Sequence, residues 1–417
     1  MAAQKKYGDL LTSQDFIDCE AAHGAHNYHP LPVVLKRGQG PFLWDVEGKQ
    51  YFDCLSAYSS VNQGHCHPRL VKVMQEQCSQ LTLTSRAFHN DQMGAYAKYI
   101  TDYFGYDKVL PMNSGVEAGE TAVKLARKWA YEVKGTEPNQ AHIVFAKNNF
   151  WGRTLAACSS STDPDCYGNY GPFIPNFHVV EYNDVEALRA LFESLDNVAA
   201  FYIEPIQGEA GVVVPADGYL KKCQELCREF NALLICDEIQ TGLCRTGRLL
   251  CSDWDGVKPD ILVLGKALSG GMLPVSAVLC SDEIMLTVKP GQHGSTYGGN
   301  PLACAVAMEA LRILKDENLA ARAEELGKRF MGRIAALSEE VDFIDHVRGR
   351  GLLIGVVCKE GHPISAWKVC LELKERGVLA KPTHEHIIRF APPLVITDEE
   401  LDELLGRVES VFKNSKM

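Results

Sequence analysis

Two polar residues stand directly after two short hydrophobic runs of the chain. Asp237 follows the run at residues 232–236, and Lys266 follows the run at 261–264 after a single glycine. Uninterrupted apolar runs of this length indicate parallel strands covered on both faces, and ligands bind outside the carboxyl ends of such strands. We therefore expect both side chains to point into one crevice. A lysine that forms a Schiff base and a carboxylate that pairs with a ring nitrogen are typical of a pyridine cofactor site. A buried structural ion pair is the alternative, and the spacing alone does not decide between the two.

The segment NSGVEAGETA at residues 113–122 opens a predicted helix. It follows an apolar run at 108–112, and small and apolar residues then recur at steps of three and four as far as Lys134, with Gly135 as the expected stop. A Ser-Gly turn at the start of a helix exposes backbone N–H groups at the positive end of the helix dipole, which suits a phosphate. The segment lacks the Gly-Lys-Ser/Thr of a P-loop. An ordinary helix N-cap is the alternative interpretation.

Two aromatic residues and an arginine follow the next predicted strand, at residues 142–145. Phe150 and Trp151 could form a stacking face for a ring, and Arg153 could anchor a carboxylate, because its guanidinium group binds two oxygens at once. A packed turn is the alternative for these three residues.

The elements that must position these residues indicate the fold class. Strands and helices alternate from about Val109 to Leu264, which predicts an α/β fold with a mostly parallel sheet. Before this region, alternating runs predict the strands of a small antiparallel sheet, at residues 33–35, 42–46 and 50–52. After it, the sequence predicts a mixed tail with helices at 302–316, 320–338, 367–376 and 398–412, and strands at 352–357 and 387–390.

This order of elements predicts three units. Residues 1–53 should form an N-terminal arm with one helix and a small antiparallel sheet. Residues 54–305 should form the large domain, and residues 306–417 a smaller α+β domain against which the N-terminal sheet packs.

Charge and composition exclude several classes of protein. A net charge of −11, without a long basic run, argues against a nucleic-acid surface. No run of about 18 apolar residues occurs, so no membrane-spanning helix is expected. The 15 cysteines form no disulfide framework and fit reduced thiols inside a cell. The start, MAAQKKYGDLL, resembles neither a signal peptide nor a transit peptide, and we therefore predict a cytoplasmic protein.

No metal site is expected. The neighbouring residues His65, Cys66 and His67 and the pair Cys223 and Cys227 are the groups that come nearest to a ligand pattern. Neither group has a second ligand pair at zinc spacing.

Taken together, these motifs resemble the fold-type I enzymes that use pyridoxal 5′-phosphate, and among them the class III aminotransferases, in particular those that act on ornithine. The resemblance runs over nearly the whole chain, from residues 25–30 to residues 389–394. Its strongest segments are CDEIQTGLCRTG, LGKALSGGMLPVSAVL, GQHGSTYGGNP and LAKPTHEHIIRFAPPL. It implies a large domain with a mostly parallel central sheet and a smaller α+β domain.

The resemblance implies a role for four side chains around the cofactor ring. Lys266 would form the Schiff base and act as the catalytic base, and Asp237 would pair with the ring nitrogen. Gln240 would reach the ring hydroxyl, and Phe150 would stack on the ring.

The phosphate would be bound from two subunits. The resemblance assigns it the backbone amides of Gly115 and Val116, and it assigns Ser295 and Thr296 to the phosphate of the neighbouring subunit's cofactor. Shared sites of this kind imply a homodimer, the commonest closed symmetry.

The resemblance also implies a substrate pocket. Arg153 would bind the distal carboxylate of ornithine and Tyr28 its α-amino group, while Tyr58, with Trp151 nearby, would shape the pocket. A second group of residues would act as a gate. Glu209 and Arg389 would be paired while ornithine is bound, and would separate so that Arg389 can hold the α-carboxylate of glutamate or 2-oxoglutarate.

The implied reaction is ping-pong transamination of L-ornithine and 2-oxoglutarate to L-glutamate 5-semialdehyde and L-glutamate, with small molecules and a second copy of the chain as partners. N-acetylornithine or 4-aminobutyrate are alternative amino donors, because one tyrosine change could shift the preference. A non-catalytic binding protein on the same fold is a further alternative, against which the presence of Lys266 and Asp237 argues.

Overall fold

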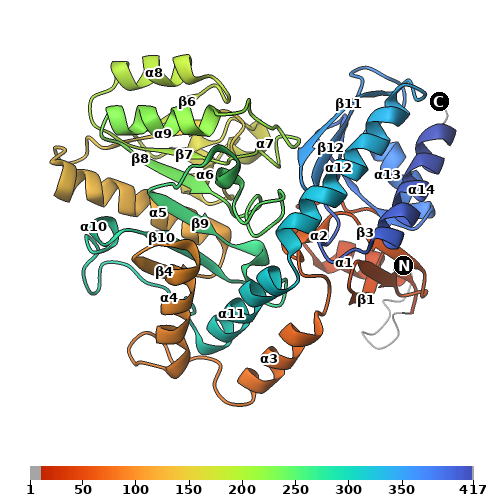
Figure 1. Ribbon diagram of the computed structural model, residues 1–417, viewed down its shortest axis with the longest axis horizontal. Coiled ribbons are helices and arrows are strands. Elements are labelled where there is room, and N and C mark those ends of the chain that lie inside the picture. The colour runs from red at the N-terminus through yellow and green to blue at the C-terminus, as the bar shows by residue number, and fades with distance from the viewer. Residues whose placement is uncertain (1–10, 416–417) are drawn as a thin grey trace.

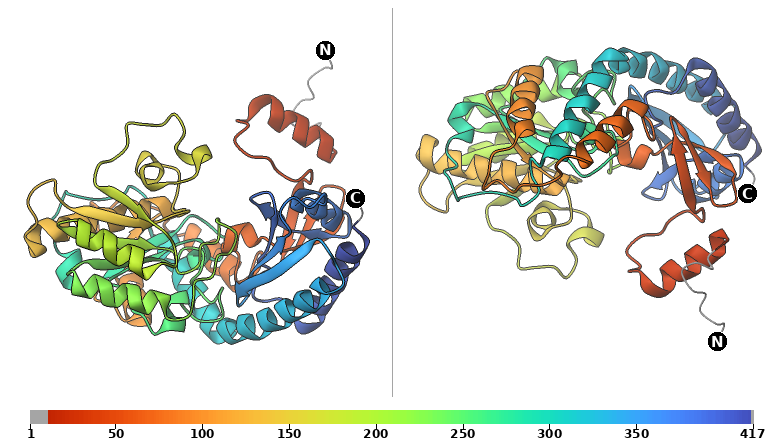
Figure 2. Two further views of the ribbon diagram at one scale, coloured as in Figure 1. Left: turned by 90° about the horizontal axis from the view of Figure 1, so that it is seen from above. Right: turned by 90° about the horizontal axis from the view of Figure 1, so that it is seen from below.

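The computed structural model describes residues 11–415 of the chain. Two lobes lie side by side, one built around a large central sheet and the other formed mostly by the C-terminal elements (Figure 1). The long helix α12 (Leu319–Ser338) runs from the first lobe across to the second (Figure 2). Among the described residues no helix is long and apolar enough to span a membrane.

A seven-stranded sheet forms the core of the larger lobe. Its strand order is β4-β10-β9-β8-β7-β5-β6. β10 is antiparallel to both of its neighbours, and the remaining pairs are parallel. This arrangement confirms the predicted α/β fold with a mostly parallel sheet. The strands are β4 (Lys108–Met112), β5 (His142–Ala146), β6 (Phe177–Val180), β7 (Val198–Ile203), β8 (Leu233–Asp237), β9 (Ile261–Leu264) and β10 (Ser276–Cys280).

Helices cover both faces of this sheet, because alternate residues of each strand are buried on opposite sides. On β5, Ile143 and Phe145 pack with α5, whereas Val144 and Ala146 pack on the face of α8 and α9. α4 and α11 continue the second face over β9 and β10. The helices of this lobe are α3 (Pro68–Cys78), α4 (Asp91–Phe104), α5 (Gly115–Trp129), α6 (Leu155–Ser160), α7 (Pro164–Tyr167), α8 (Val185–Ser194), α9 (Tyr219–Glu229), α10 (Asp282–Met285) and α11 (Pro301–Asp316).

The second lobe contains two four-stranded sheets. In the first, β1, β2 and β3 from the N-terminal part are joined by β13, which pairs in parallel with β3. The second is antiparallel in the order β11-β12-β15-β14. The strands are β1 (Leu35–Gln39), β2 (Phe42–Asp45), β3 (Gln50–Asp53), β11 (Ile344–Arg350), β12 (Leu353–Cys358), β13 (Val378–Leu379), β14 (Lys381–Thr383) and β15 (Ile387–Phe390), and α13 (Ala366–Glu375) and α14 (Asp398–Asn414) complete the lobe.

Helix α1 (Ser13–His23) stands away from the body of the molecule in both views of Figure 2. It is capped by Thr12 and has no buried residue, so it is held by its own hydrogen bonds and by a contact of Ser13 with Glu47. The expected N-terminal arm with one helix therefore has its helix here. The part of that prediction that concerns residues 1–10 lies outside the described residues.

Strand β1 lies elsewhere than predicted, and strand β11 was not predicted. The sequence predicts the first strand at residues 33–35, but β1 occupies Leu35–Gln39, which is a polar and mostly exposed edge strand without apolar alternation. Strand β11 is not predicted, because Gly349-Arg350-Gly351 suggests only the start of the following strand. β11 runs through Arg350, and the turn comes at Gly351, whose φ is +54°. Only one residue of this strand is buried, so its sequence lacks a hydrophobic signal.

Candidate active site

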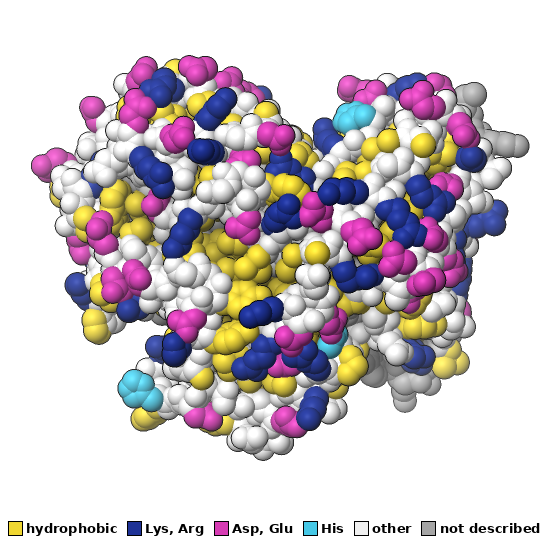
Figure 3. Space-filling model, in the orientation of Figure 1, with side chains coloured by type: hydrophobic (Ala, Val, Ile, Leu, Met, Phe, Trp, Pro, Cys, Tyr) yellow, Lys and Arg dark blue, Asp and Glu magenta, His cyan; other side chains and the backbone are white. Residues whose placement is uncertain are grey.

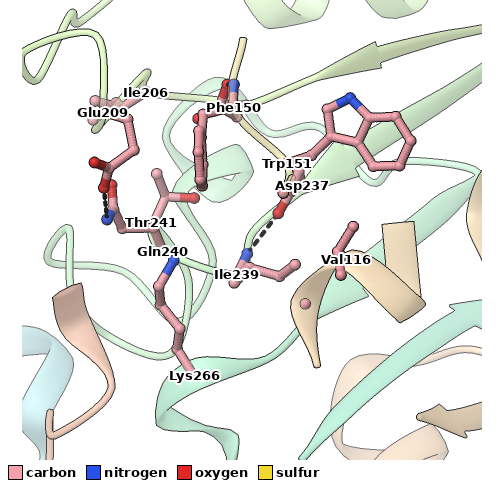
Figure 4. A pocket seen from close by; sticks show the side chains of 13 residues that line it. Val116, Phe150, Trp151, Ile206, Glu209, Asp237, Ile239, Gln240, Thr241 and Lys266 are labelled. Atoms are coloured by element: carbon pink, nitrogen blue, oxygen red, sulfur yellow. Dashed lines mark hydrogen bonds between the residues drawn. The ribbon is translucent and has the colours of Figure 1, made fainter. Parts of the chain in front are cut away.

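A cavity of about 240 Å³ lies at the carboxyl ends of β7 and β8 and beside the turn after β9. Asp237 is the last residue of β8, Glu204 follows β7, and Lys266 follows β9 after Gly265. The predicted crevice with both Asp237 and Lys266 is therefore confirmed, as Figure 4 shows. The cavity wall includes eight of the sequence-predicted site residues: Gly115, Val116, Phe150, Trp151, Glu209, Asp237, Gln240 and Lys266.

Lys266 begins a short 3-10 helix and has a φ of +46°, a backbone conformation that side-chain-bearing residues rarely adopt. Its side chain lines the cavity and points into it (Figure 4). Burial lowers the pKa of the Lys266 amine below its ordinary value, although the carboxylates of Glu209 and Asp237 oppose this shift. A larger share of the amine is therefore neutral at physiological pH, as a nucleophile or a base requires.

Asp237 is held by two donors. The hydroxyl of Tyr202 donates to Oδ2 at 2.7 Å, and the backbone N–H of Ile239 donates to Oδ1 at 3.0 Å. Burial raises the pKa of Asp237, while Tyr202, Ile239 and the charge of Lys266 pull it down. A carboxylate that is fixed and desolvated in this way is stabilised by a cationic partner.

Glu204 and Tyr202 belong to the site and were not singled out from the sequence. Glu204 lines the cavity, and the backbone N–H of Phe150 donates to its Oε1 at 2.8 Å. Burial, and then the nearby charge of Asp237, raise the pKa of Glu204 well above its ordinary value. Glu204 carries the same signal as Asp237, because it too follows a buried strand. Tyr202 lies inside that strand, and nothing in its local pattern distinguishes it.

The start of α5 forms one wall of the cavity. Ser114 caps the helix by accepting from the N–H of Glu117, and the Glu117 carboxylate accepts in return from the N–H groups of Ser114 and Asn113. The N-cap interpretation is therefore correct. The phosphate interpretation remains possible beside it. Gly115 and Val116 line the cavity, and the first amides of a helix have no acceptor within that helix. Beyond Trp129 the helix continues as a π-helix that ends at Gly135, as predicted.

Three polar side chains meet at one edge of the cavity. Nη1 of Arg389 donates to Oε1 of Glu209 at 2.8 Å and to the carbonyl of Gly208 at 3.2 Å, and Nε2 of Gln240 donates to the same Glu209 oxygen at 3.0 Å. Burial would raise the pKa of Glu209, but the charges of Arg389 and Lys266 outweigh it and lower that pKa. Oε1 of Gln240 is buried and, within residues 11–415, has no hydrogen-bond partner.

Tyr58 lies next to this cluster on an unusual turn. The Arg389 guanidinium sits 4.9 Å from the centre of the Tyr58 ring. Residues Ser56–Ser59 (α2) all have positive φ, so they form a left-handed turn. The carboxylate of Asp53 accepts from the backbone N–H groups of Leu55 and Ser56 and supports the turn. Clustered positive φ values of this kind are typical of functional sites.

Of the remaining predicted substrate residues, Trp151 lines the cavity, whereas Arg153 and Tyr28 do not. Arg153 is exposed, with its guanidinium 5.7 Å from the centre of the Phe150 ring. Trp151 is buried and its indole N–H donates to Ser160, so it provides an apolar wall and no free donor. Tyr28 is 70% exposed and is not among the residues that line the cavity; Lys381 lies over its ring at 5.8 Å.

Ser295 and Thr296 are also outside the cavity wall of this chain. Ser295 Oγ accepts from Nδ2 of Asn113 at 2.8 Å, just before α5, and Thr296 is exposed.

Comparison with known proteins agrees with this geometry. The family model of the class III aminotransferases matches residues 23–412, and the chain belongs to that family. The mitochondrial ornithine aminotransferase of Drosophila melanogaster is 60% identical over 395 residues, which cover 94% of this chain and 90% of that protein. A solved ornithine aminotransferase from Toxoplasma gondii has a TM-score of 0.95 at 53% identity and covers 97% of this chain and 94% of its own. An acetylornithine aminotransferase structure from Elizabethkingia anophelis has a TM-score of 0.88 at 54% identity, with 96% and 98% covered.

The resemblance inferred from the motifs is thereby confirmed, and the chain is an aminotransferase of fold type I that uses pyridoxal 5′-phosphate. The residues at the cavity fit this cofactor. Lys266 offers an amine with a lowered pKa, Asp237 a fixed carboxylate for a protonated ring nitrogen, and Gln240 a buried oxygen without a partner in the described chain.

The prediction of a cytoplasmic protein is contradicted. Relatives from two Drosophila species, Caenorhabditis elegans and Rattus norvegicus, 58–60% identical to this chain, are named as mitochondrial enzymes. The prediction relied on the composition of residues 1–11. The compartment of an enzyme is set by targeting signals outside its fold, and that composition was not a sufficient basis for it.

Proposed function

We propose that this aminotransferase acts on L-ornithine and 2-oxoglutarate and produces L-glutamate 5-semialdehyde and L-glutamate. The observation that carries this proposal is the ion pair of the buried Arg389 with the partly buried Glu209 at the edge of the cavity. An aminotransferase for one cationic diamino acid and one dicarboxylate needs an arginine that is neutralised for the first substrate and available for the second. A paired arginine of this kind meets that requirement.

The cofactor residues take the following roles in this proposal. The amides of Gly115 and Val116 bind the phosphate, because they lie at the positive end of α5. The ring of Phe150 covers one side of the pyridine ring. Asp237 binds the ring nitrogen, and Gln240 lies near the ring hydroxyl.

Lys266 moves the proton in the reaction. When bound, pyridoxal phosphate supplies an aldehyde for the amino group and a ring that accepts electrons. The neutral Nζ of Lys266 takes the proton from the substrate carbon that bears nitrogen and returns it on the cofactor side. Asp237 keeps the ring nitrogen protonated, and Tyr202 keeps Asp237 in place. The apolar walls Ile206 and Ile239 help to exclude water from this transfer.

Glu209 and Arg389 select the substrate in each half-reaction. While they are paired, Arg389 does not attract a second carboxylate, and the cationic ornithine enters with its δ-amine toward Lys266. When the pair opens, the two donors of the Arg389 fork can hold the α-carboxylate of glutamate or 2-oxoglutarate. The exposed Arg153 binds the carboxylate far from the reacting carbon, which is the single carboxylate of ornithine in the first half and the γ-carboxylate of glutamate or 2-oxoglutarate in the second.

Tyr58, Trp151 and Tyr28 complete the substrate pocket in this proposal. Tyr58 and Trp151 limit its width. Tyr28 binds the α-amino group of ornithine. Its position supports this role, because it lies over Lys381, which pairs in register with Arg389 across β14 and β15.

A homodimer completes each site. Ser295 and Thr296 lie outside the cavity of their own chain and are proposed to bind the phosphate in the neighbouring subunit. Exposed hydrophobic side chains support an association surface near them. The exposed Tyr297 follows Thr296 directly. The exposed Phe88 is also close to this loop, because its chain neighbours Arg86 and Met93 lie next to Gly299. Hydrophobic side chains also gather across the middle of the face in Figure 3.

We also propose the division into residues 1–53, 54–305 and 306–417. The parallel pairing of β3 with β13 supports packing of the N-terminal sheet with the small domain. The seven strands of the large sheet all fall between residues 108 and 280, which supports the limits of the large domain.

The proposed reaction is tested by its two halves. The absorption band of the holoenzyme should disappear with L-ornithine and return with 2-oxoglutarate. Bleaching by N-acetylornithine would support the second candidate, which the acetylornithine aminotransferase from Elizabethkingia anophelis motivates, and bleaching by 4-aminobutyrate would indicate a broader ω-aminotransferase. No spectral change with ornithine would contradict the proposal.

The gate is tested separately by Glu209→Ala. This variant leaves Arg389 unpaired and should speed the reaction of α-amino acids such as glutamate relative to that of ornithine. The ratio of the two half-reaction rates is the measurement, because it cancels a general loss of activity. An unchanged ratio would refute the gate.

A further inference from the structure

The loop at residues 291–299 carries Ser295 and Thr296. In its first half, two hydrogen bonds join Gln292 to Lys289, but these are local and do not connect the loop to the body. Gly291 has a φ of +84°, and a Cβ atom at Gly291 or Gly294 would meet nothing within 4 Å. Glycine-rich, open segments of this kind gain order only from specific contacts. The position of the two hydroxyl residues therefore depends on the side chains that connect this loop to the body.

His293 makes such a connection. One ring nitrogen, Nε2, lies 2.9 Å from the hydroxyl of Thr121, and the other, Nδ1, lies 2.8 Å from Nζ of Lys124. Both partners belong to α5, one and two turns beyond the phosphate-binding positions. His293 thus fastens the loop to the same helix whose first amides are proposed to bind the phosphate of their own subunit.

The partners fix the protonation state of His293. The Thr121 hydroxyl donates to the carbonyl of Glu117 at 2.7 Å, so its oxygen can accept from Nε2–H. The Lys124 ammonium has only protons to give, so Nδ1 must accept. The ring is therefore neutral, with its proton on Nε2. Burial, and then the charge of Lys124, lower the pKa of His293, in agreement with a neutral ring.

We propose that His293 is a positioning residue for the cofactor site of the neighbouring subunit: by joining Thr121 and Lys124 it holds loop 291–299 so that Ser295 and Thr296 can bind that subunit's phosphate. The inference rests on the proposed function and deepens it, because it makes α5 serve two sites. Its first amides face one phosphate, and its second and third turns orient the loop that reaches the other.

The direct test is the dissociation constant of pyridoxal phosphate, measured on the apo-protein by fluorescence. His293→Phe should weaken cofactor binding by about tenfold, roughly the effect of losing one hydrogen bond. At saturating cofactor the kcat for ornithine should stay near that of the wild type, since no catalytic group moves. His293→Gln should restore binding, because its amide can still donate to Thr121. Unchanged binding in His293→Phe, or no recovery in His293→Gln, would overturn the proposal.

A second pair of variants covers the case in which His293→Phe does not fold. Thr121→Val removes the acceptor without a change in volume and should weaken cofactor binding, whereas Thr121→Ser keeps the hydroxyl and should not. The matched control is His346→Gln, at an exposed histidine whose side chain hydrogen-bonds to Asp345 and to no other side chain within residues 11–415. Equal binding by the Thr121 variants would count against the proposal.

A mixed dimer tests which subunit the loop serves. A His293→Phe subunit is paired with a Lys266→Ala subunit, and the pair is isolated with two affinity tags. The intact Lys266 then belongs to the chain with the altered loop, and the intact loop belongs to the other chain. Cofactor binding at that lysine should return to wild-type affinity. Persisting weak binding would show that the loop serves its own chain and would overturn the proposal, whatever the ornithine half-reaction of the wild type shows.

Discussion

Lys266 combines a strained backbone with an amine that is desolvated by burial. Its φ is +46°, and burial lowers its pKa below the ordinary 10.5. The neutral amine is the form that attacks an aldehyde, and its share rises as the pH passes the pKa. A lowered pKa therefore shifts this rise to lower pH.

The rate at which the apo-protein combines with pyridoxal phosphate should accordingly increase through a midpoint below pH 10.5. Stopped-flow absorbance over a pH series gives this midpoint, and Nα-acetyl-lysine under the same conditions provides the reference. A midpoint equal to or above that of the reference would show that Lys266 is not desolvated in solution.

Tyr202 offers a second prediction at this scale. Tyr202→Phe removes the 2.7 Å hydrogen bond to Asp237 and one of the influences that lower the Asp237 pKa, so the carboxylate is more easily protonated and pairs less well with the ring nitrogen. The rate of the ornithine half-reaction should fall by about tenfold, the equivalent of roughly 1.4 kcal/mol. Tyr96→Phe is the matched control, because the Tyr96 hydroxyl is also buried but has no hydrogen-bond partner among the described residues. Similar losses in both variants would point to packing alone.

The residue scale also shows how far the sequence could be interpreted. The position of Asp237 and Lys266 in one cavity was predictable, because each follows an apolar run with the length of a buried strand. Glu204 carries the same signal and could have been included. Tyr202 could not, since its contact with Asp237 joins neighbouring parallel strands 35 residues apart, and strand register is not written in local sequence.

At the scale of elements, α5 lies unusually close to the sheet. A Cβ atom on Gly119 would come within 2.7 Å of the Trp151 ring and 3.0 Å of the Tyr202 hydroxyl. Gly119→Ala should therefore destabilise the fold by about 1–3 kcal/mol through overpacking. In α4, a Cβ atom on Gly94 would meet nothing within 4 Å, so Gly94→Ala should stabilise by up to about 1 kcal/mol. The measurement is the thermal unfolding midpoint of each variant. A shift of the same sign in both variants would refute the close contact at Gly119.

Two of the elements that the sequence did not predict share a physical cause. The turn at Ser56–Ser59 is left-handed without a single glycine, at a cost of roughly 1–2 kcal/mol per residue. Besides the nearby Asp53, distant contacts such as the bond from Ser56 Oγ to the carbonyl of Ala391 stabilise it. Strand β11 likewise depends on pairing with β12, because its own residues are mostly exposed. Local propensity predicts elements that would form by themselves, and these do not.

On the scale of the whole molecule, a single hydrophobic core runs from the sheet strands β9 and β10 through α11 and α12 to α14. The active site lies where the two lobes meet, since Lys266 and Asp237 come from the large sheet and Arg389 from β15. The α/β class could be predicted from the alternation of strands and helices. The pairing of β3 with β13 could not, because it joins strands that are far apart in the sequence.

Arg245 connects the lobes at this meeting point. Its side chain is fully buried and donates to the carbonyls of Leu352 and Pro392 and to Oδ1 of Asn62. Asn62 lies in the large lobe, and the other two acceptors lie in the C-terminal lobe, with Pro392 three residues after Arg389. Burial lowers the pKa of Arg245 to about 9, and the charge of Asp53 opposes this shift.

Removing this side chain should cost more than removing an exposed arginine beside it. Arg245→Met leaves three buried acceptors without a donor, each worth about 1–3 kcal/mol, so the free energy of unfolding should drop by roughly 3 kcal/mol or more. Arg248 pairs with Glu324 across the same boundary but is 40% exposed, and Arg248→Met should cost about 1 kcal/mol or less. Denaturant unfolding of the holoenzyme compares the free energies of unfolding of the two variants.

A further readout is the KM for 2-oxoglutarate, which should rise only in Arg245→Met, because Pro392 anchors the segment that carries Arg389. Equal losses of stability with unchanged KM would mean that the lobes are held together by their hydrophobic core alone.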